Sequence, residues 1–115
     1  MLEHAELCVG EPVGVVTLRG YLAPRRILSF CAETCALDLF PGPSRRGTPL
    51  RVRLVVGDGA SQMAPLPEGY GDRDLRIRDG HGDALALDQP VLVTGTRAGE
   101  PPACELRVTW LEAAP

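Results

Sequence analysis

The sequence has no lysine and few aromatic residues. All 12 basic residues are arginine, and the aromatic rings amount to one tryptophan, two tyrosines and two phenylalanines. A lack of lysine is typical of GC-rich genomes, although the planar arginine side chain also suits phosphates and stacking on bases. Five rings make a weak platform for base stacking. The composition is therefore compatible with nucleic-acid binding but does not indicate it.

Long apolar runs are also missing. No segment approaches the roughly 20 apolar residues that cross a bilayer, and the start of the chain lacks the basic region of a secretion signal. We therefore expect a soluble, cytoplasmic protein with no membrane partner. The net charge of −3 argues against coating of nucleic acid by bulk electrostatics. Residues 1–57 nevertheless hold seven arginines against five acids, so a locally basic face can form.

The length predicts a single domain over residues 1–115. A chain of this size buries roughly two-thirds of the surface that its unfolded form exposes, so it can fold without metals or disulfides. Apolar residues make up 44% and charged residues 23%, as in ordinary globular domains. We therefore expect one ordered domain and no cofactor.

Apolar residues recur with a period of two, the pattern of half-buried strands. In Val13–Leu22, one face carries Val16, Leu18, Gly20 and Leu22, and the other carries Val15, Thr17, Arg19 and Tyr21. Leu50–Val56 places its aliphatic residues inward and Arg51 and Arg53 outward. Gly20 and Gly95 predict a bend, a bulge or a strand end.

Shorter strands are predicted further along the chain, each bounded by turn residues. They are Cys35–Phe40, Leu75–Arg78, Ala84–Leu87, Val91–Thr96 and Glu105–Leu111. No segment has a convincing helical period, and Gly57–Asp72 reads as a long loop. Short strands at this spacing indicate an all-β sandwich or barrel, and we expect an antiparallel β-barrel of five to seven strands with little helix.

The order of these signals resembles the oligonucleotide/oligosaccharide-binding (OB) fold, particularly its small bacterial forms. The first strand of the resemblance is Val15–Leu22, in which an apolar alternation ends in a glycine. Gln89–Thr96 matches a turn followed by the fourth strand, and Cys104–Glu112 matches the last strand. Two features depart from it: Asp88-Gln89-Pro90 replaces the usual turn glycine, and the expected helix between strands three and four is not evident.

The resemblance implies that a ligand lies across the second and third strands and the adjoining loops. The residues that could bind nucleic acid there are Arg19, Tyr21, Arg25, Arg26, Phe30, Arg45, Arg46, Arg51 and Arg53. Tyr21 and Phe30 are the stacking candidates, whereas Trp110 is in phase with Leu106 and Val108 and is expected in the core. Alternating arginines also fit an ordinary solvated strand face.

The four cysteines admit one metal arrangement. His4 and Cys8 form one pair with three intervening residues, and Cys31 and Cys35 form another, so the four could close a tetrahedral zinc site. Buried free thiols are the commoner outcome, and a cytoplasmic chain does not favour disulfides. We therefore predict no metal site and buried, unpaired cysteines.

The sequence lacks the residue groups that enzymes use. It has no nucleophile elbow, no phosphate-binding glycine loop and no pair of metal-binding histidines, so we expect no catalytic activity. The leading hypothesis is a module that binds single-stranded DNA or RNA through an arginine-lined face. The alternative is an adaptor or accessory subunit that docks a protein partner.

Overall fold

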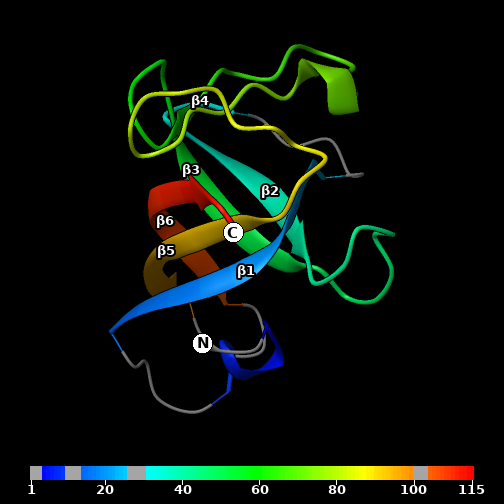
Figure 1. The fold of residues 1–115 in the computed structure, drawn as a ribbon, viewed down its shortest axis with the longest axis vertical. Helices are drawn as coiled ribbons and strands as arrows, with labels where there is room; N and C mark the ends of the chain where they lie inside the picture. Colours follow the sequence, from blue (N-terminus) through cyan, green and yellow to red (C-terminus); the bar gives the residue numbers. More distant parts are fainter. Residues whose placement is uncertain (1–3, 10–13, 26–30, 100–103) are drawn as a thin grey trace.

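The computed structural model describes residues 4–9, 14–25, 31–99 and 104–115, and shows an all-β protein (Figure 1). The two helical turns are 3₁₀ helices of three residues each. The elements in chain order are η1 (His4–Glu6), β1 (Val15–Pro24), β2 (Thr34–Phe40), β3 (Leu50–Val56), β4 (Gln62–Met63), η2 (Asp72–Asp74), β5 (Val91–Ala98) and β6 (Glu105–Ala113).

Five strands close into a small barrel. The sheet order is β2-β1-β5-β6-β3-β4, and a further pairing of β2 with β3 completes the ring. All the barrel contacts are antiparallel except that between β3 and β6, which run parallel. With β5 and β6 as the fourth and fifth barrel strands, this is an OB-like arrangement and confirms the predicted fold class. The bounds of β3 match the predicted strand.

Gly20 lies where β1 changes partners. The strand pairs with β5 as far as Gly20 and with β2 from Tyr21 onward. A Cβ atom at Gly20 would lie 2.6 Å from the Phe40 carbonyl oxygen, so only glycine allows the two backbones to approach. The glycine therefore marks a bend inside a strand that continues to Pro24, and not a strand end.

Gly95 marks a β-bulge, and this bulge corrects the prediction for Trp110. Thr94 pairs with Trp110, but Gly95 pairs with Val108, so Thr109 is an extra residue in β6. The extra residue reverses the inward and outward alternation. Leu106 and Val108 are buried as expected, whereas Trp110 points outward and is 38% exposed. The prediction that Trp110 belongs to the core was wrong, because it assumed that the alternation of Leu106 and Val108 continues unchanged past the extra residue Thr109.

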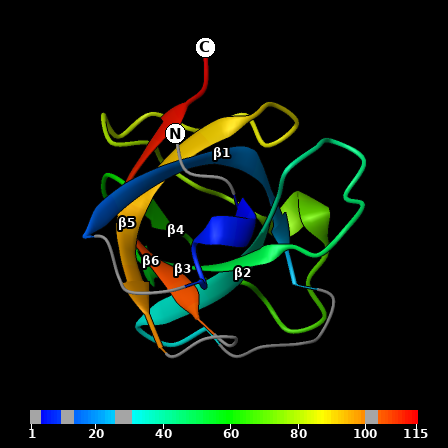
Figure 2. The ribbon, with the colours of Figure 1, turned by 90° about the horizontal axis from the view of Figure 1, so that it is seen from below.

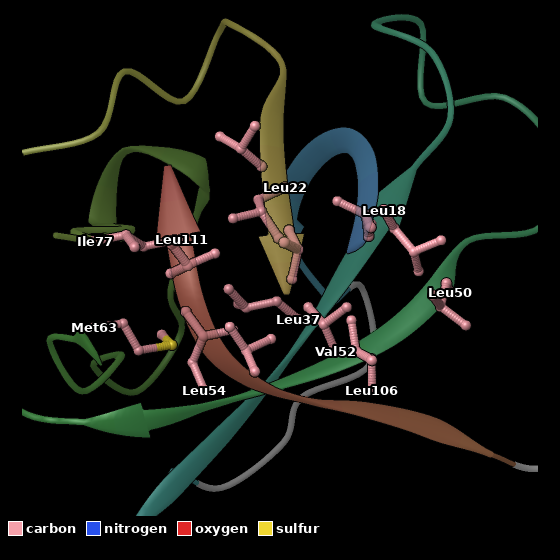
Figure 3. Close-up of a cluster of buried hydrophobic side chains, with 14 of the residues drawn as sticks. Leu18, Leu22, Leu37, Leu50, Val52, Leu54, Met63, Ile77, Leu106 and Leu111 are labelled. Carbon is pink, nitrogen blue, oxygen red and sulfur yellow. The ribbon is translucent and has the colours of Figure 1, made fainter. Parts of the chain in front are cut away.

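The barrel interior is filled by aliphatic side chains (Figure 3). The predicted core residues are all buried: Leu18, Val52, Leu54, Val93, Leu106 and Val108. Their burial confirms the registers assigned to β1 and β3. Met63, Leu75, Ile77 and Leu85 join the same cluster from outside the five barrel strands.

Segments outside the five strands cover both ends of the barrel. Seen along the barrel, η1 lies across one opening, where Leu7 is buried (Figure 2). Residues 57–90 cover the opposite end in place of the helix that many OB folds have between these strands (Figure 1). Predicted strands at Leu75–Arg78 and Ala84–Leu87 are not formed: those segments make only the isolated bridges of Ile77 to Met63 and Arg78 to Ala84. The apolar residues of these two segments alternate because Leu75, Ile77 and Leu85 pack into the core at this end of the barrel.

The bulge gives a direct test of the fold. A Cβ atom at Gly95 would lie 2.0 Å from the Arg107 carbonyl oxygen, a backbone atom that cannot move without breaking the β5–β6 ladder. Gly95→Ala should therefore lower the free energy of unfolding by about 1–3 kcal/mol, as overpacking does, measured by urea denaturation. Gly42→Ala is the matched control, because no atom lies within 4 Å of its added Cβ. Equal stability of the two variants would mean that the bulge is misplaced.

Candidate ligand-binding face

Four of the predicted binding residues lie on β1 and β3: Arg19, Tyr21, Arg51 and Arg53. We call the outer surface of β1, β2 and β3 the β1–β3 face. Tyr21 on β1 is half-buried and pairs with Phe40 on β2. Asp38 on β2 pairs with Arg51 on β3. In β2, the alternation that places Cys35, Leu37 and Leu39 in the core places Asp38 on the outer side. The local sequence therefore determines which side chains of β2 belong to the β1–β3 face.

A cleft of about 220 Å³ opens at one end of this face. Its walls come from the end of β1, the outer side of β2, the β2–β3 loop and the segment around η2. We call it the β2 cleft, and its lining residues are Ala23, Pro24, Arg25, Asp38, Phe40, Arg45, Tyr70, Gly71 and Asp72.

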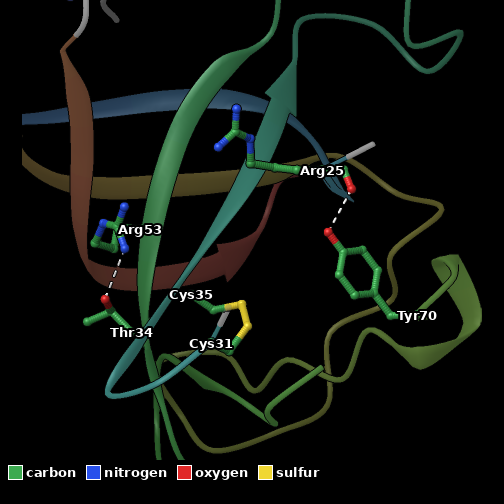
Figure 4. The surroundings of a disulfide bond; sticks show 6 residues. All are labelled: Arg25, Cys31, Thr34, Cys35, Arg53 and Tyr70. Atoms are coloured by element: carbon green, nitrogen blue, oxygen red, sulfur yellow. Dashed lines mark hydrogen bonds between the residues drawn. A yellow bond between two sulfur atoms is a disulfide. The ribbon is translucent and has the colours of Figure 1, made fainter. Parts of the chain in front are cut away.

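Tyr70 holds the segment before η2 against the end of β1. Its hydroxyl donates a hydrogen bond of 2.8 Å to the Arg25 carbonyl oxygen, and its ring is half-buried (Figure 4). The Gly71 amide then donates to a carboxylate oxygen of Asp74 at 2.8 Å. These bonds fix one wall of the cleft although the segment has little regular structure.

Two ion pairs line the cleft. Arg25 Nε lies 3.7 Å from Asp38 Oδ1, with both side chains mostly buried. Arg45 Nη1 donates to Asp72 Oδ2 at 2.6 Å across the mouth, where both side chains are more exposed. Arg45 has a φ of 56°, a left-handed conformation that costs a non-glycine residue about 1–2 kcal/mol. The cleft therefore carries positive and negative charge in balance.

Arg53 does not line the cleft and forms an ion pair with Glu105 on β6 instead. Its guanidinium donates to both carboxylate oxygens of Glu105 on β6, at 2.8 and 3.2 Å, and to the Thr34 hydroxyl at 3.1 Å. Figure 4 shows the bond to Thr34. A bidentate pair of this kind is geometrically specific, so Arg53 is held along the barrel wall.

The remaining predicted arginines are exposed. Arg19 lies on the outer side of β1, Arg46 in the β2–β3 loop and Arg51 on β3. Among the described residues, none of their guanidinium groups makes an ion pair. Arg26 and Phe30 lie outside the described residues, so the structure does not place them.

Sequence reasoning missed the acidic and aromatic side chains of the cleft: Asp38, Phe40, Tyr70 and Asp72. Phe40 and Asp38 could have been found, because they occupy the outward phase of β2 that the buried Leu37 and Leu39 define. Tyr70 and Asp72 gave no such signal, since they approach the barrel from a long irregular segment.

The cysteines correct the prediction of unpaired thiols. Cys8 pairs with Cys104, and Cys31 pairs with Cys35 (Figure 4), so none of the four is free. The prediction of unpaired thiols was wrong because residues 96 apart in sequence give no sign that they meet. The four zinc candidates are all engaged in other contacts, because the three cysteines form disulfides and His4 Nε2 lies 2.8 Å from the Arg19 carbonyl oxygen. Within the described residues no metal-binding group of three such side chains forms.

No protein-family model, curated protein or solved structure matches the chain. What the β2 cleft binds must therefore be argued from its own geometry. No helix of the described residues is long and apolar enough to cross a membrane.

The two disulfides should differ in their effect on stability. In the chain-entropy model, the Cys8–Cys104 bond contributes about 4–5 kcal/mol because it closes a long loop, and Cys31–Cys35 contributes about 2 kcal/mol. Replacing both cysteines of the first pair with serine should therefore lower Tm more than replacing both of the second, as measured by calorimetry. A wild-type Tm that dithiothreitol leaves unchanged would argue that neither bond forms.

Proposed function

We propose that this barrel is a non-catalytic module that binds single-stranded nucleic acid across the β1–β3 face. One observation carries the proposal: the β2 cleft joins arginine donors to aromatic rings. OB-like barrels bind their ligands on this part of the surface, over the second and third strands and the neighbouring loops. One base would enter the cleft, and the backbone would follow the strand surface beside it.

The size and lining of the cleft suit one ring. Its volume of about 220 Å³ is below the ~300–1,000 Å³ of pockets for drug-sized ligands. Tyr70 offers a half-buried ring at the wall, and Phe40, which is buried at 6% exposure, also lines the cleft. Base stacking on such rings contributes about 1–3 kcal/mol per base.

The arginines of this face can contact only a few phosphates of a single strand. Arg46 and Arg51 are exposed near the cleft, whereas Arg25, Arg45 and Arg53 already face carboxylates. Few cations are therefore available for phosphates, which agrees with the net charge of −3. We expect binding that depends weakly on salt and in which base contacts supply much of the affinity.

A protein partner is the second candidate, and Trp110 favours it. This side chain is 38% exposed on β6 and makes an edge-to-face contact with His81 at 5.5 Å. Exposed tryptophans are common at the centres of protein interfaces. An adaptor that used this surface would tolerate changes in the β2 cleft and lose its partner when Trp110 is replaced with alanine.

Salt titration tests the nucleic-acid proposal. If Arg51 contacts a phosphate, Arg51→Gln should weaken binding of labelled single-stranded DNA or RNA. It should also flatten the log–log salt dependence by about 0.7, the slope lost with one contact. Arg78→Gln is the control, since it removes the same charge from an exposed residue outside the face. If the wild-type protein binds no single strand even at low salt, the proposal fails and the adaptor replaces it.

Stacking makes a separate prediction at Tyr70. Tyr70→Leu should weaken binding by about 1–3 kcal/mol with an unchanged salt slope, because stacking releases no counterions. Tyr70→Phe keeps the ring and removes the hydroxyl that donates to the Arg25 carbonyl oxygen, so it should bind more tightly than the leucine variant. Fluorescence anisotropy at several salt concentrations measures both quantities. Equal weakening by both substitutions would show that the hydroxyl matters and the ring does not.

A further inference from the structure

The β2 cleft presents hydrogen-bond donors and acceptors side by side. Its donors are the guanidinium groups of Arg25 and Arg45, and its acceptors are the carboxylates of Asp38 and Asp72. A cleft built for phosphate would not place two carboxylates at the anion, because like charges repel. The lining therefore favours an uncharged group that offers acceptors along one edge and donors along another.

Both guanidinium groups keep donors for such a ligand. Arg45 contacts Asp72 through Nη1, and Arg25 Nε lies 3.7 Å from Asp38 Oδ1. A guanidinium has five N–H donors, more than either of these contacts uses. Within the described part of the chain, neither guanidinium makes a further hydrogen bond. Both arginines can thus bind a ligand without giving up their carboxylates.

Guanine has the matching pattern. Its O6 and N7 accept a bidentate contact from arginine, and its N1–H and exocyclic amine, on the Watson–Crick edge, can donate to a carboxylate. Adenine places a donor beside N7, uracil and thymine lack the exocyclic amine, and cytosine has no edge equivalent to O6 and N7. Proteins read unstacked bases of single strands along these edges.

We infer that the β2 cleft selects guanine among the bases of a single strand. The inference rests on the proposed function and goes further, since stacking alone would accept any base. Asp38 and Asp72 become the residues that set base preference, whereas Arg51 and Arg46 on the open surface serve any sequence. The Tyr70 ring holds the base plane, and the polar side chains read its edges.

The test compares oligomers that differ at one base. We would measure wild-type affinity for an oligothymidine of about eight nucleotides, within the range bound by one OB fold, with thymine, guanine, adenine, hypoxanthine or 7-deazaguanine at the centre. Guanine should bind roughly five- to a hundred-fold more tightly than thymine or adenine, the range expected for one bidentate base contact. Hypoxanthine lacks the exocyclic amine and 7-deazaguanine lacks N7, so each should lose part of the gain.

A variant tests the assignment to the cleft. Asp38→Asn exchanges one acceptor for a donor and should reduce the ratio of guanine to thymine affinity toward one. Asp88→Asn is the control: it makes the same chemical change at an exposed residue outside the cleft and should leave the ratio unchanged. Thermal melts establish that both variants fold, and the base-analogue series on wild-type protein needs no variant.

The outcomes separate the two proposals. Binding of all oligomers with equal affinity would overturn guanine selection and leave the proposed function standing. Binding of none at low salt would overturn the proposed function and guanine selection with it. A guanine preference that survives both Asp38→Asn and Asp72→Asn would place the selective contact elsewhere and contradict the inference.

Discussion

The structure depends on closing the barrel between β3 and β6. These strands run parallel and share only two residue pairs, Val52 with Leu106 and Arg53 with Arg107. The bidentate contact of Arg53 with Glu105 reinforces this short ladder. Further along β6, residues 57–90 take the place of a neighbouring strand. The Leu111 amide donates to Ser61 Oγ at 3.1 Å, and the Leu111 carbonyl accepts from the Gly80 amide at 2.6 Å. Because buried backbone groups must be paired, this irregular segment, which covers one end of the barrel, also completes the hydrogen bonding of β6.

This closure divides the arginines into two groups. Arg53 lies beside the seam and its guanidinium is occupied, although by sequence it is indistinguishable from Arg51, two residues earlier on the same face. Arg51 remains exposed and pairs across the β2–β3 ladder with Asp38, which lines the β2 cleft. The two arginines occupy equivalent positions in the sequence pattern but differ in their capacity to bind a ligand. Arg53 lies beside Glu105 of β6 and is held by it, whereas Arg51 pairs with Asp38 of β2 and stays exposed.

Sequence periodicity predicted most of the barrel and part of the site. Alternation in β1 and β3 identified the core face because each strand keeps one phase over its length. It failed at Trp110, where the bulge at Gly95 shifts the phase, and at residues 75–87, where apolar residues enter the barrel end without forming strands. The cleft depends on Tyr70 and Asp72, which are brought to β1 and the β2–β3 loop by contacts over 45 and 27 residues. Local patterns carry no information about such contacts.

The charge balance decides how a ligand can be held. A chain of net charge −3 whose cleft arginines face carboxylates gains little from counterion release. Affinity must then come from stacking and from hydrogen bonds made where water is partly excluded, and these are the contacts that distinguish one base from another. Trp110 lies on β6, away from the residues that line the cleft. A single strand in the β2 cleft and a protein against Trp110 would use different lining residues, so binding one does not require giving up the other.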